Sequence, residues 1–249
     1  MLRLEGKVAI VTGASRGIGR ATAKLFAAEG SKVAVLARTA DSVATVVMDI
    51  ERAGGAAIGI PCDVADPQQI AAAVAQVVDA YGGIDILVNN AFDPSVVSSP
   101  IIDLSVEQLQ RNFDTGPIAH LRMMQACFPH LKASREGRVI NFASVAGVVG
   151  MVPYGPYAMA KEAIRALTRV AAREWGPHGI TVNNVLPLAA TYEEMTNAGV
   201  PAPNTPLARL GSPEEDIAPV VLFLASRDAK FLTGYGLSPD GGMMIDSAR

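Results

Sequence analysis

Near its start the chain reads Val8-Ala-Ile-Val-Thr12-Gly13-Ala-Ser-Arg16-Gly17-Ile-Gly19, and this stretch decides the fold. A short apolar run followed by glycines is typical of a buried strand that turns sharply into a helix. Glycines at such a turn let a pyrophosphate approach the backbone N–H groups at the start of the helix. The spacing Gly-x-x-x-Gly-x-Gly differs from the common G-x-G-x-x-G, so a purely structural turn stays open as an alternative to a nucleotide site.

The same alternation continues along the chain. Short apolar runs recur at residues 8–11, 33–36, 84–88, 139–142 and 180–185. Longer stretches with helical spacing separate them, among them Arg20–Glu29, Pro67–Tyr81 and Ala158–Trp175. Continuous apolar strands with helices between them indicate a parallel sheet that is covered on both faces. We therefore predict a single Rossmann-like α/β domain over residues 1–249, with a doubly wound, seven-stranded parallel sheet.

Composition excludes several classes of protein. The formal net charge is −3, which argues against a nucleic-acid or anionic-membrane partner. No apolar stretch approaches the roughly 18 residues of a membrane span, and the charged start does not resemble a signal peptide. Cys62 and Cys127 lie far apart, and the histidines match no ligand spacing, so we expect buried thiols and no metal. A soluble, cytoplasmic protein is the expectation.

The end of the second predicted strand bears on the choice of cofactor. An NAD site usually places an acid here, about 20 residues after the glycines, to bind the ribose 2′-hydroxyl. This chain instead reads Leu36-Ala37-Arg38-Thr39 and has no acid before Asp41. Arg38, helped by Arg16, could pair with a 2′-phosphate. We therefore predict NADP(H) rather than NAD(H), with a solvated surface arginine as the alternative.

Ser144, Tyr157 and Lys161 form the candidate catalytic set. Ser144 follows the apolar run Val139–Phe142, and Pro156 favours the first turn of a helix that carries Tyr157 and Lys161 on one face. A free tyrosine titrates near pH ~10, and a lysine cation beside it favours the phenolate. By itself Tyr-x-x-x-Lys is common on helix surfaces, so other motifs must support a chemical role.

Six motifs in this order resemble the short-chain dehydrogenase/reductase family in its small, single-domain form. They are the glycine motif, Asn89-Asn90-Ala91, Ser144, Tyr157-x-x-x-Lys161, Thr233-Gly234 and Asp240-Gly241-Gly242. The resemblance covers nearly the whole chain. It implies that Tyr157 is the general acid/base, that Lys161 binds the nicotinamide ribose and lowers the tyrosine pKa, and that Ser144 orients the substrate oxygen.

The resemblance also implies the contacts of the dinucleotide. They are Gly13, Ser15, Arg16, Gly17, Ile18, Gly19, Arg38, Asp63, Val64, Asn90, Ala91, Tyr157, Lys161, Pro187 and Thr191. Within this set, Asp63 would accept a hydrogen bond from the adenine amino group. The family further suggests a homotetramer in which two long helices, Ser105–Lys132 and Ala158–Trp175, pack across subunits.

Three positions depart from the family pattern. Phe92 replaces a glycine that keeps the space over the cofactor open, so we expect its ring either to turn away or to narrow the pocket. Leu188 replaces the glycine after Pro187. Gly116 falls where the family has a catalytic asparagine. Because Pro117 cannot continue a helix without distortion, we expect a bend there.

The Gly116 carbonyl is expected to share a water with Lys161. Restoring the side chain, Gly116→Asn, is then expected to raise turnover by about tenfold or less.

Residues 188–211 are polar and irregular, and we predict that they form a lid over the substrate. Tyr192, Met195 and Val200 could close over an apolar ligand, or the loop could pack on itself. The prediction is an NADP(H)-dependent oxidoreductase that interconverts a ketone and a secondary alcohol on a small, largely apolar substrate. The alternative is a dinucleotide-binding sensor or scaffold without turnover.

Overall fold

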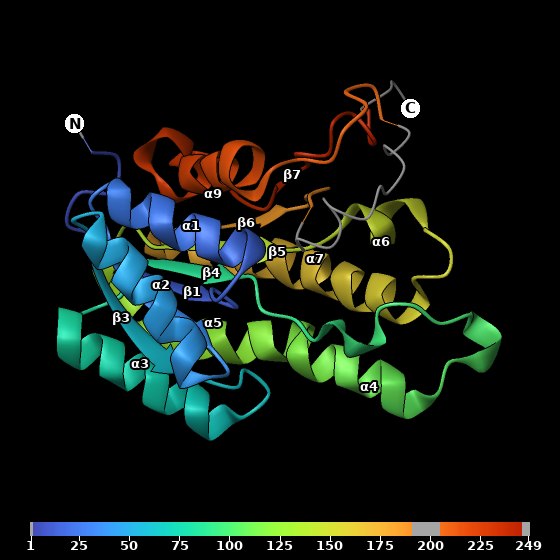
Figure 1. Ribbon diagram of the computed structural model, residues 1–249, viewed down its shortest axis with the longest axis horizontal. Coiled ribbons are helices and arrows are strands. Elements are labelled where there is room, and N and C mark those ends of the chain that lie inside the picture. The colour runs from blue at the N-terminus through green and yellow to red at the C-terminus, as the bar shows by residue number, and fades with distance from the viewer. Residues whose placement is uncertain (1, 191–204, 246–249) are drawn as a thin grey trace.

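The computed structural model describes residues 2–190 and 205–245, and within them it has one seven-stranded, all-parallel sheet. The strand order is β3-β2-β1-β4-β5-β6-β7, with helices on both faces (Figure 1). The predicted Rossmann-like, doubly wound fold is confirmed. The strands are β1 (Val8–Thr12), β2 (Lys32–Ala37), β3 (Ala56–Pro61), β4 (Ile86–Asn89), β5 (Arg138–Phe142), β6 (Thr181–Val185) and β7 (Gly236–Leu237).

The helices divide between the two faces of the sheet (Figure 1). One face carries α1 (Gly17–Ala28), α2 (Ala40–Arg52) and α9 (Ala218–Ala225). The other carries α3 (Pro67–Tyr81), α4 (Val106–Thr115), α5 (Pro117–Ser134) and α7 (Gly155–Trp175). A short helix, α6 (Val145–Val149), follows β5 directly.

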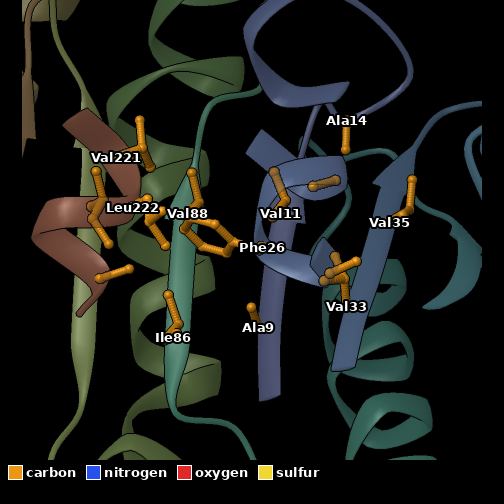
Figure 2. Close-up of a cluster of buried hydrophobic side chains, with 14 of the residues drawn as sticks. Ala9, Val11, Ala14, Phe26, Val33, Val35, Ile86, Val88, Val221 and Leu222 are labelled. Atoms are coloured by element: carbon orange, nitrogen blue, oxygen red, sulfur yellow. The ribbon is translucent and has the colours of Figure 1, made fainter. Parts of the chain in front are cut away.

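Two hydrophobic cores lie between these layers, because successive side chains of a strand point to opposite faces. Ala9 and Val11 of β1 belong to one core, and Val8 and Ile10 of the same strand belong to the other. In the first core, Phe26 of α1 lies among Val11, Val88 of β4 and Leu222 of α9 (Figure 2). Burial on both faces explains why the strands read as continuous apolar runs.

The sheet changes its winding direction between β1 and β4. The chain runs outward from β1 to β3, and then returns to β4 on the opposite side of β1 and continues to β7. A crevice therefore opens at the carboxyl ends of β1 and β4, which is where ligands bind in open α/β sheets. Gly13 and Asn90 follow these two strand ends.

Most predicted elements occur where expected, and α3 has the predicted bounds. The predicted helix Ser105–Lys132 is wrong as one continuous element, because it divides into α4 and α5 at Gly116. The predicted bend at this point is confirmed: Gly116 has φ −100° and ψ −109°, outside the helical range. Cys62 and Cys127 are buried free thiols, as predicted. No helix among the described residues is long and apolar enough to cross a membrane.

Candidate active site

The turn after β1 has the conformation that its glycines allow. Gly13 (φ +63°) and Gly17 (φ +52°) are left-handed, which glycine adopts without strain. The side chain of Arg16 does not cap α1, and the first turn of α1 contains no acidic residue. The N-terminus of this helix therefore presents N–H groups and a positive dipole end to an anion.

Thr12 and Asn90 connect the two strand ends that border the crevice. The Thr12 hydroxyl accepts hydrogen bonds from the N–H groups of Asn90 (3.0 Å) and Ala91 (3.1 Å). The Asn90 amide donates to the carbonyls of Thr12 (3.0 Å) and Gly13 (3.1 Å). A side chain at Gly19 would collide with the Asn90 amide, since its Cβ would lie 2.6 Å away. A glycine at position 19 therefore allows α1 to pack closely against the turn and Asn90.

One cavity of about 1500 Å³ extends along the crevice. It brings together most of the predicted cofactor residues: Gly13, Ser15, Arg16, Gly17, Ile18, Arg38, Asp63, Val64, Asn90, Ala91, Tyr157, Lys161 and Pro187. Gly19 and Ser144 do not line it, although Ala143, the neighbour of Ser144, does. Thr191 and the predicted lid residues Tyr192, Met195 and Val200 lie outside the described residues.

Lys161 is the most unusual charged group at this cavity, because it is only 3 % exposed. Burial lowers the pKa of its ammonium to about 7. The ammonium donates a hydrogen bond to the carbonyl of Phe142 at 2.8 Å. Its Nζ atom also lies 5.4 Å from the centroid of the Tyr157 ring, one turn earlier on α7. Tyr157 and Lys161 thus stand side by side at the cavity wall.

A ladder of buried amides holds α7 against the sheet. Asn89, Asn141 and Asn184 occupy paired positions on β4, β5 and β6. The Asn89 amide donates to Asn141 (2.9 Å), and the Asn141 amide donates to the Thr168 hydroxyl of α7 (2.9 Å). Thr168 in turn donates to Asn184 (2.9 Å). The position of the helix that carries Tyr157 and Lys161 is therefore set by polar contacts as well as by packing.

Ser144 begins α6 at the carboxyl end of β5, where the sequence predicts it. Its hydroxyl oxygen caps the helix by accepting from the Ala146 N–H at 3.2 Å. A capping hydroxyl uses its oxygen as the acceptor, so its own proton stays available for donation to a substrate oxygen.

Phe92 turns toward Tyr157 and Lys161 and narrows the cavity beside them. Its ring meets Tyr157 edge-on, with centroids 5.9 Å apart, and the Lys161 Nζ lies 5.4 Å from its centroid. The side chain lines the cavity and stays 39 % exposed. Of the two orientations expected from the sequence, the structure has the one that restricts access to Tyr157.

The cavity wall at the end of β2 is basic. Arg38 and Arg16 both line it, together with Thr39 and Ser42 at the start of α2. Asp41, the nearest acid after the strand, does not line the cavity. Asp63, which follows the neighbouring strand β3, lines the same cavity, so the two arginines share it with a carboxylate.

The expectations for Gly116 need correction. Its carbonyl already accepts from the backbone N–H of His120 (2.9 Å) and meets the Nδ1 atom of the same residue (2.8 Å). Both lone pairs are then used, so the expected water between Gly116 and Lys161 has no acceptor there. A Cβ at Gly116 would lie 2.6 Å from the carbonyl oxygen of Asn112. A side chain at Gly116 would therefore strain the bend, which argues against the expected gain of turnover from Gly116→Asn.

Several features of the site could not be predicted from the sequence. The amide ladder has a faint signal, since an asparagine lies near the carboxyl end of three apolar runs. The Gly116 carbonyl meets both the backbone N–H and the Nδ1 atom of His120, and no sequence pattern indicates the contact with the side chain. The α4 residues Glu107, Gln110, Arg111 and Asp114 also line the cavity, and their sequence reads as an ordinary solvated face.

The two ends of the predicted lid meet at one place. Backbone hydrogen bonds join Leu188 to Gly211 (3.0 Å) and Ala190 to Gly211 (3.0 Å), and Leu188 also donates to Pro239 (3.1 Å). Leu188 and Ala189 line the cavity. The described residues on either side of 191–204 are therefore paired with each other just after Pro187.

Comparisons with known proteins agree with this geometry. The family model described as enoyl-(acyl carrier protein) reductase matches residues 13–244. The chain is 38 % identical to a 2,5-dichloro-2,5-cyclohexadiene-1,4-diol dehydrogenase of Sphingobium indicum, over 97 % of this chain and 98 % of that protein. It is also 38 % identical to a 3-oxoacyl-(acyl-carrier-protein) reductase of Vibrio cholerae, over 98 % of this chain and 100 % of that protein.

A solved structure is similar over the same extent. It is described as a short-chain alcohol dehydrogenase from Sinorhizobium meliloti, and it superposes with a TM-score of 0.88 at 32 % identity, covering 96 % of this chain and 97 % of that one. The chain therefore belongs to the short-chain dehydrogenase/reductase family, and it is an oxidoreductase that acts on CH–OH groups.

Proposed function

We propose that the protein is an NADP(H)-dependent oxidoreductase that interconverts a ketone and a secondary alcohol on a small, largely apolar substrate. The observation that carries the proposal is the single cavity, which joins the glycine turn and Arg38 at one end to Tyr157 and Lys161 at the other. A dinucleotide needs such an arrangement, because its phosphates and its nicotinamide must be bound in one groove.

The residues present fit a dinucleotide. The uncapped start of α1 and the left-handed glycines can receive a pyrophosphate. Arg38 and Arg16 line the cavity while Asp41 lies outside its wall, which supports the choice of a 2′-phosphate over a free 2′-hydroxyl. When bound, the nicotinamide ring supplies or takes up the hydride at its C4 atom.

The chain's own residues handle the proton. During reduction Tyr157 donates its hydroxyl proton to the substrate oxygen, and during oxidation the phenolate takes that proton back. Lys161, while charged, favours the phenolate form of Tyr157. Ser144 donates a hydrogen bond to the same oxygen, where negative charge develops. Phe92 beside Tyr157, and Leu188 and Ala189 elsewhere in the cavity lining, are apolar and support an apolar substrate.

The test is a screen of ketones with NADPH, repeated with Tyr157→Phe. This variant keeps the ring and its edge-on contact with Phe92 but has no proton to transfer, so we expect turnover to fall about 10²-fold or more. NADPH affinity should change little. A Tyr157→Phe enzyme that keeps its rate refutes this mechanism, and a protein that binds NADPH but reduces no carbonyl supports the non-catalytic alternative.

We also propose a homotetramer. Leu121 on α5 and Met159 and Val170 on α7 are apolar and exposed (40 %, 45 % and 54 %), which favours their burial between subunits. Ala160 and Ala171 are buried within the protomer, so these small residues serve contacts inside the chain. Light scattering on the purified protein tests the proposal. Val170→Glu should lower the measured mass, and a monomeric mass for the unmodified protein contradicts it.

A further inference from the structure

His120 is a buried side chain at the bend between α4 and α5, and it is 2 % exposed. Its Nδ1 atom lies 2.8 Å from the Gly116 carbonyl oxygen. A carbonyl only accepts hydrogen bonds, so Nδ1 must carry the proton that this contact requires. In the neutral ring the other nitrogen, Nε2, then has a lone pair and no proton.

That lone pair is the unusual feature. Nε2 is buried and has no hydrogen-bond partner among the described residues. Buried polar atoms are rarely left in this state, so the atom needs a donor. The opposite tautomer does not solve the problem, because it would place the Nδ1 lone pair against the Gly116 oxygen.

The ring stays neutral over the physiological range. Burial, and then the charge of Lys161, lower the pKa of His120 to about 3, and the carbonyls of Gly116 and Asn89 oppose this shift only partly. The Asn89 carbonyl is itself an acceptor, so it cannot serve a lone pair on Nε2. His120 therefore offers an acceptor and not a positive charge.

Lys161 lies close enough for its charge to act on His120, which makes its ammonium the candidate donor. Its ammonium carries three N–H groups, and the structure shows one bond from them, to the Phe142 carbonyl. The helices of the two residues are in contact, since a Cβ at Gly116 would meet Ala160 at 3.6 Å. Tyr157 is the titratable neighbour on the same helix. The carboxyl ends of β4 and β5 add no charged side chain here, since their residues are Asn89, Asn141 and Phe142.

We propose that His120 is a positioning residue for proton transfer at Tyr157: its Nε2 lone pair accepts a hydrogen bond from one water that the Lys161 ammonium holds in turn. This contact favours the charged form of Lys161 and opposes the loss of charge that burial causes. It also holds the ammonium next to the Tyr157 ring. The inference rests on the proposed function, because it assigns a role within the same proton transfer.

Two substitutions separate the two nitrogens of the ring. His120→Asn can keep an N–H donor near the Nδ1 position, facing the Gly116 carbonyl, and it removes Nε2. His120→Gln can place its amide oxygen near the Nε2 position and gives up the bond to Gly116. A purely structural role at the bend requires Nδ1, so His120→Asn would then resemble the unmodified protein. The proposed role requires Nε2, so His120→Gln would be the variant that resembles the unmodified protein.

The first measurement is the pH profile of kcat for alcohol oxidation. We expect the acidic limb of His120→Asn to move upward by about one pH unit, because Lys161 loses charge and the phenolate is less favoured. KM should change little. The profile of His120→Gln should stay close to that of the unmodified enzyme. An unchanged acidic limb in His120→Asn, or a shift in His120→Gln alone, overturns the proposal.

The second measurement needs no activity. The Lys161 side-chain amine can be titrated by ¹⁵N NMR in the cofactor-free protein, with Lys161→Arg to assign the signal. Its pKa should fall in His120→Asn and stay near the original value in His120→Gln, with thermal melting confirming that both variants fold. Equal pKa values in all three proteins refute the role of His120. If the protein reduces no carbonyl at all, the proposed function fails while this titration still tests the contact.

Discussion

Thr168 on α7 and Asn141 on β5 are joined by a buried hydrogen bond of 2.9 Å. Because Thr168 also donates to Asn184 on β6, its hydroxyl acts as donor and acceptor at once. Lys161 lies two turns earlier on the same helix, where it reaches the Phe142 carbonyl at the end of β5. The contact between Thr168 and Asn141 therefore sets where Tyr157 and Lys161 stand relative to the strand ends.

This contact predicts a stability effect. Thr168→Val keeps the shape but removes the hydroxyl, leaving the Asn141 amide and the Asn184 oxygen without this partner. We expect the free energy of unfolding in urea to fall by about 2–4 kcal/mol, since each unpaired buried polar group costs about 1–3 kcal/mol. Thr168→Ser retains the hydroxyl and is the control, with a smaller loss. A Thr168→Val variant as stable as the unmodified protein would show that the hydrogen bonds of this hydroxyl contribute nothing to stability.

The position of Arg38 at the cavity wall leads us to predict a preference for NADPH over NADH. If its guanidinium pairs with a 2′-phosphate, NADPH should bind at least about tenfold more tightly than NADH, a difference of ~1.4 kcal/mol. Arg38→Asp should reverse the order, because the carboxylate repels the phosphate and can accept from the ribose 2′-hydroxyl. Fluorescence titration with both nucleotides measures this, and Arg38→Gln separates loss of the cation from repulsion. Equal affinities in the unmodified protein would contradict the assignment.

From the position of the Phe92 ring beside Tyr157 we predict that this side chain limits the size of the substrate. Its ring stands edge-on to Tyr157, so Phe92→Ala should open the space beside the catalytic hydroxyl. We expect kcat/KM for a bulky ketone to rise relative to that for a small one by about tenfold or more, the scale on which pocket contacts discriminate. Phe92→Leu keeps most of the volume and should shift the ratio less. If the ratio does not move in Phe92→Ala, the ring does not restrict the substrate.

Lys161 predicts a dependence of stability on pH. Burial lowers its pKa from 10.5 in an unperturbed lysine to about 7, so between these pH values the unfolded chain holds a proton that the folded protein has lost. The unfolding free energy should then rise with pH, by up to about 1.4 kcal/mol per pH unit from this group.

Lys161→Met lacks this titration. The difference in unfolding free energy between the unmodified protein and the variant should therefore increase from pH 7 to pH 10 in the cofactor-free state. Lys132→Met, at an exposed lysine, is the control. A difference that stays constant with pH would mean that Lys161 titrates normally.

The fold followed from local patterns. Continuous apolar strands, the glycine turn after Val8–Thr12 and the helical spacing of Pro67–Tyr81 each depend on neighbours in sequence, so they could be recognised without a structure. The bend at Gly116 was also predictable, because Pro117 removes a backbone donor locally. The candidate residues of the cavity came from motif order, and the parallel topology then explains why turns so far apart in sequence converge.

What the sequence alone determined is therefore the class of fold, the family and the identity of the candidate groups. Only the tertiary structure decided how these groups meet. The Phe92 ring could have turned away from Tyr157, the Gly116 carbonyl could have stayed clear of the His120 side chain, and an added side chain at Gly116 could have been tolerated. Each outcome depends on contacts with residues distant in the chain, or on a backbone angle that those contacts impose. Long-range packing and the supply of buried hydrogen-bond partners are properties of the assembled fold, and no local pattern encodes them.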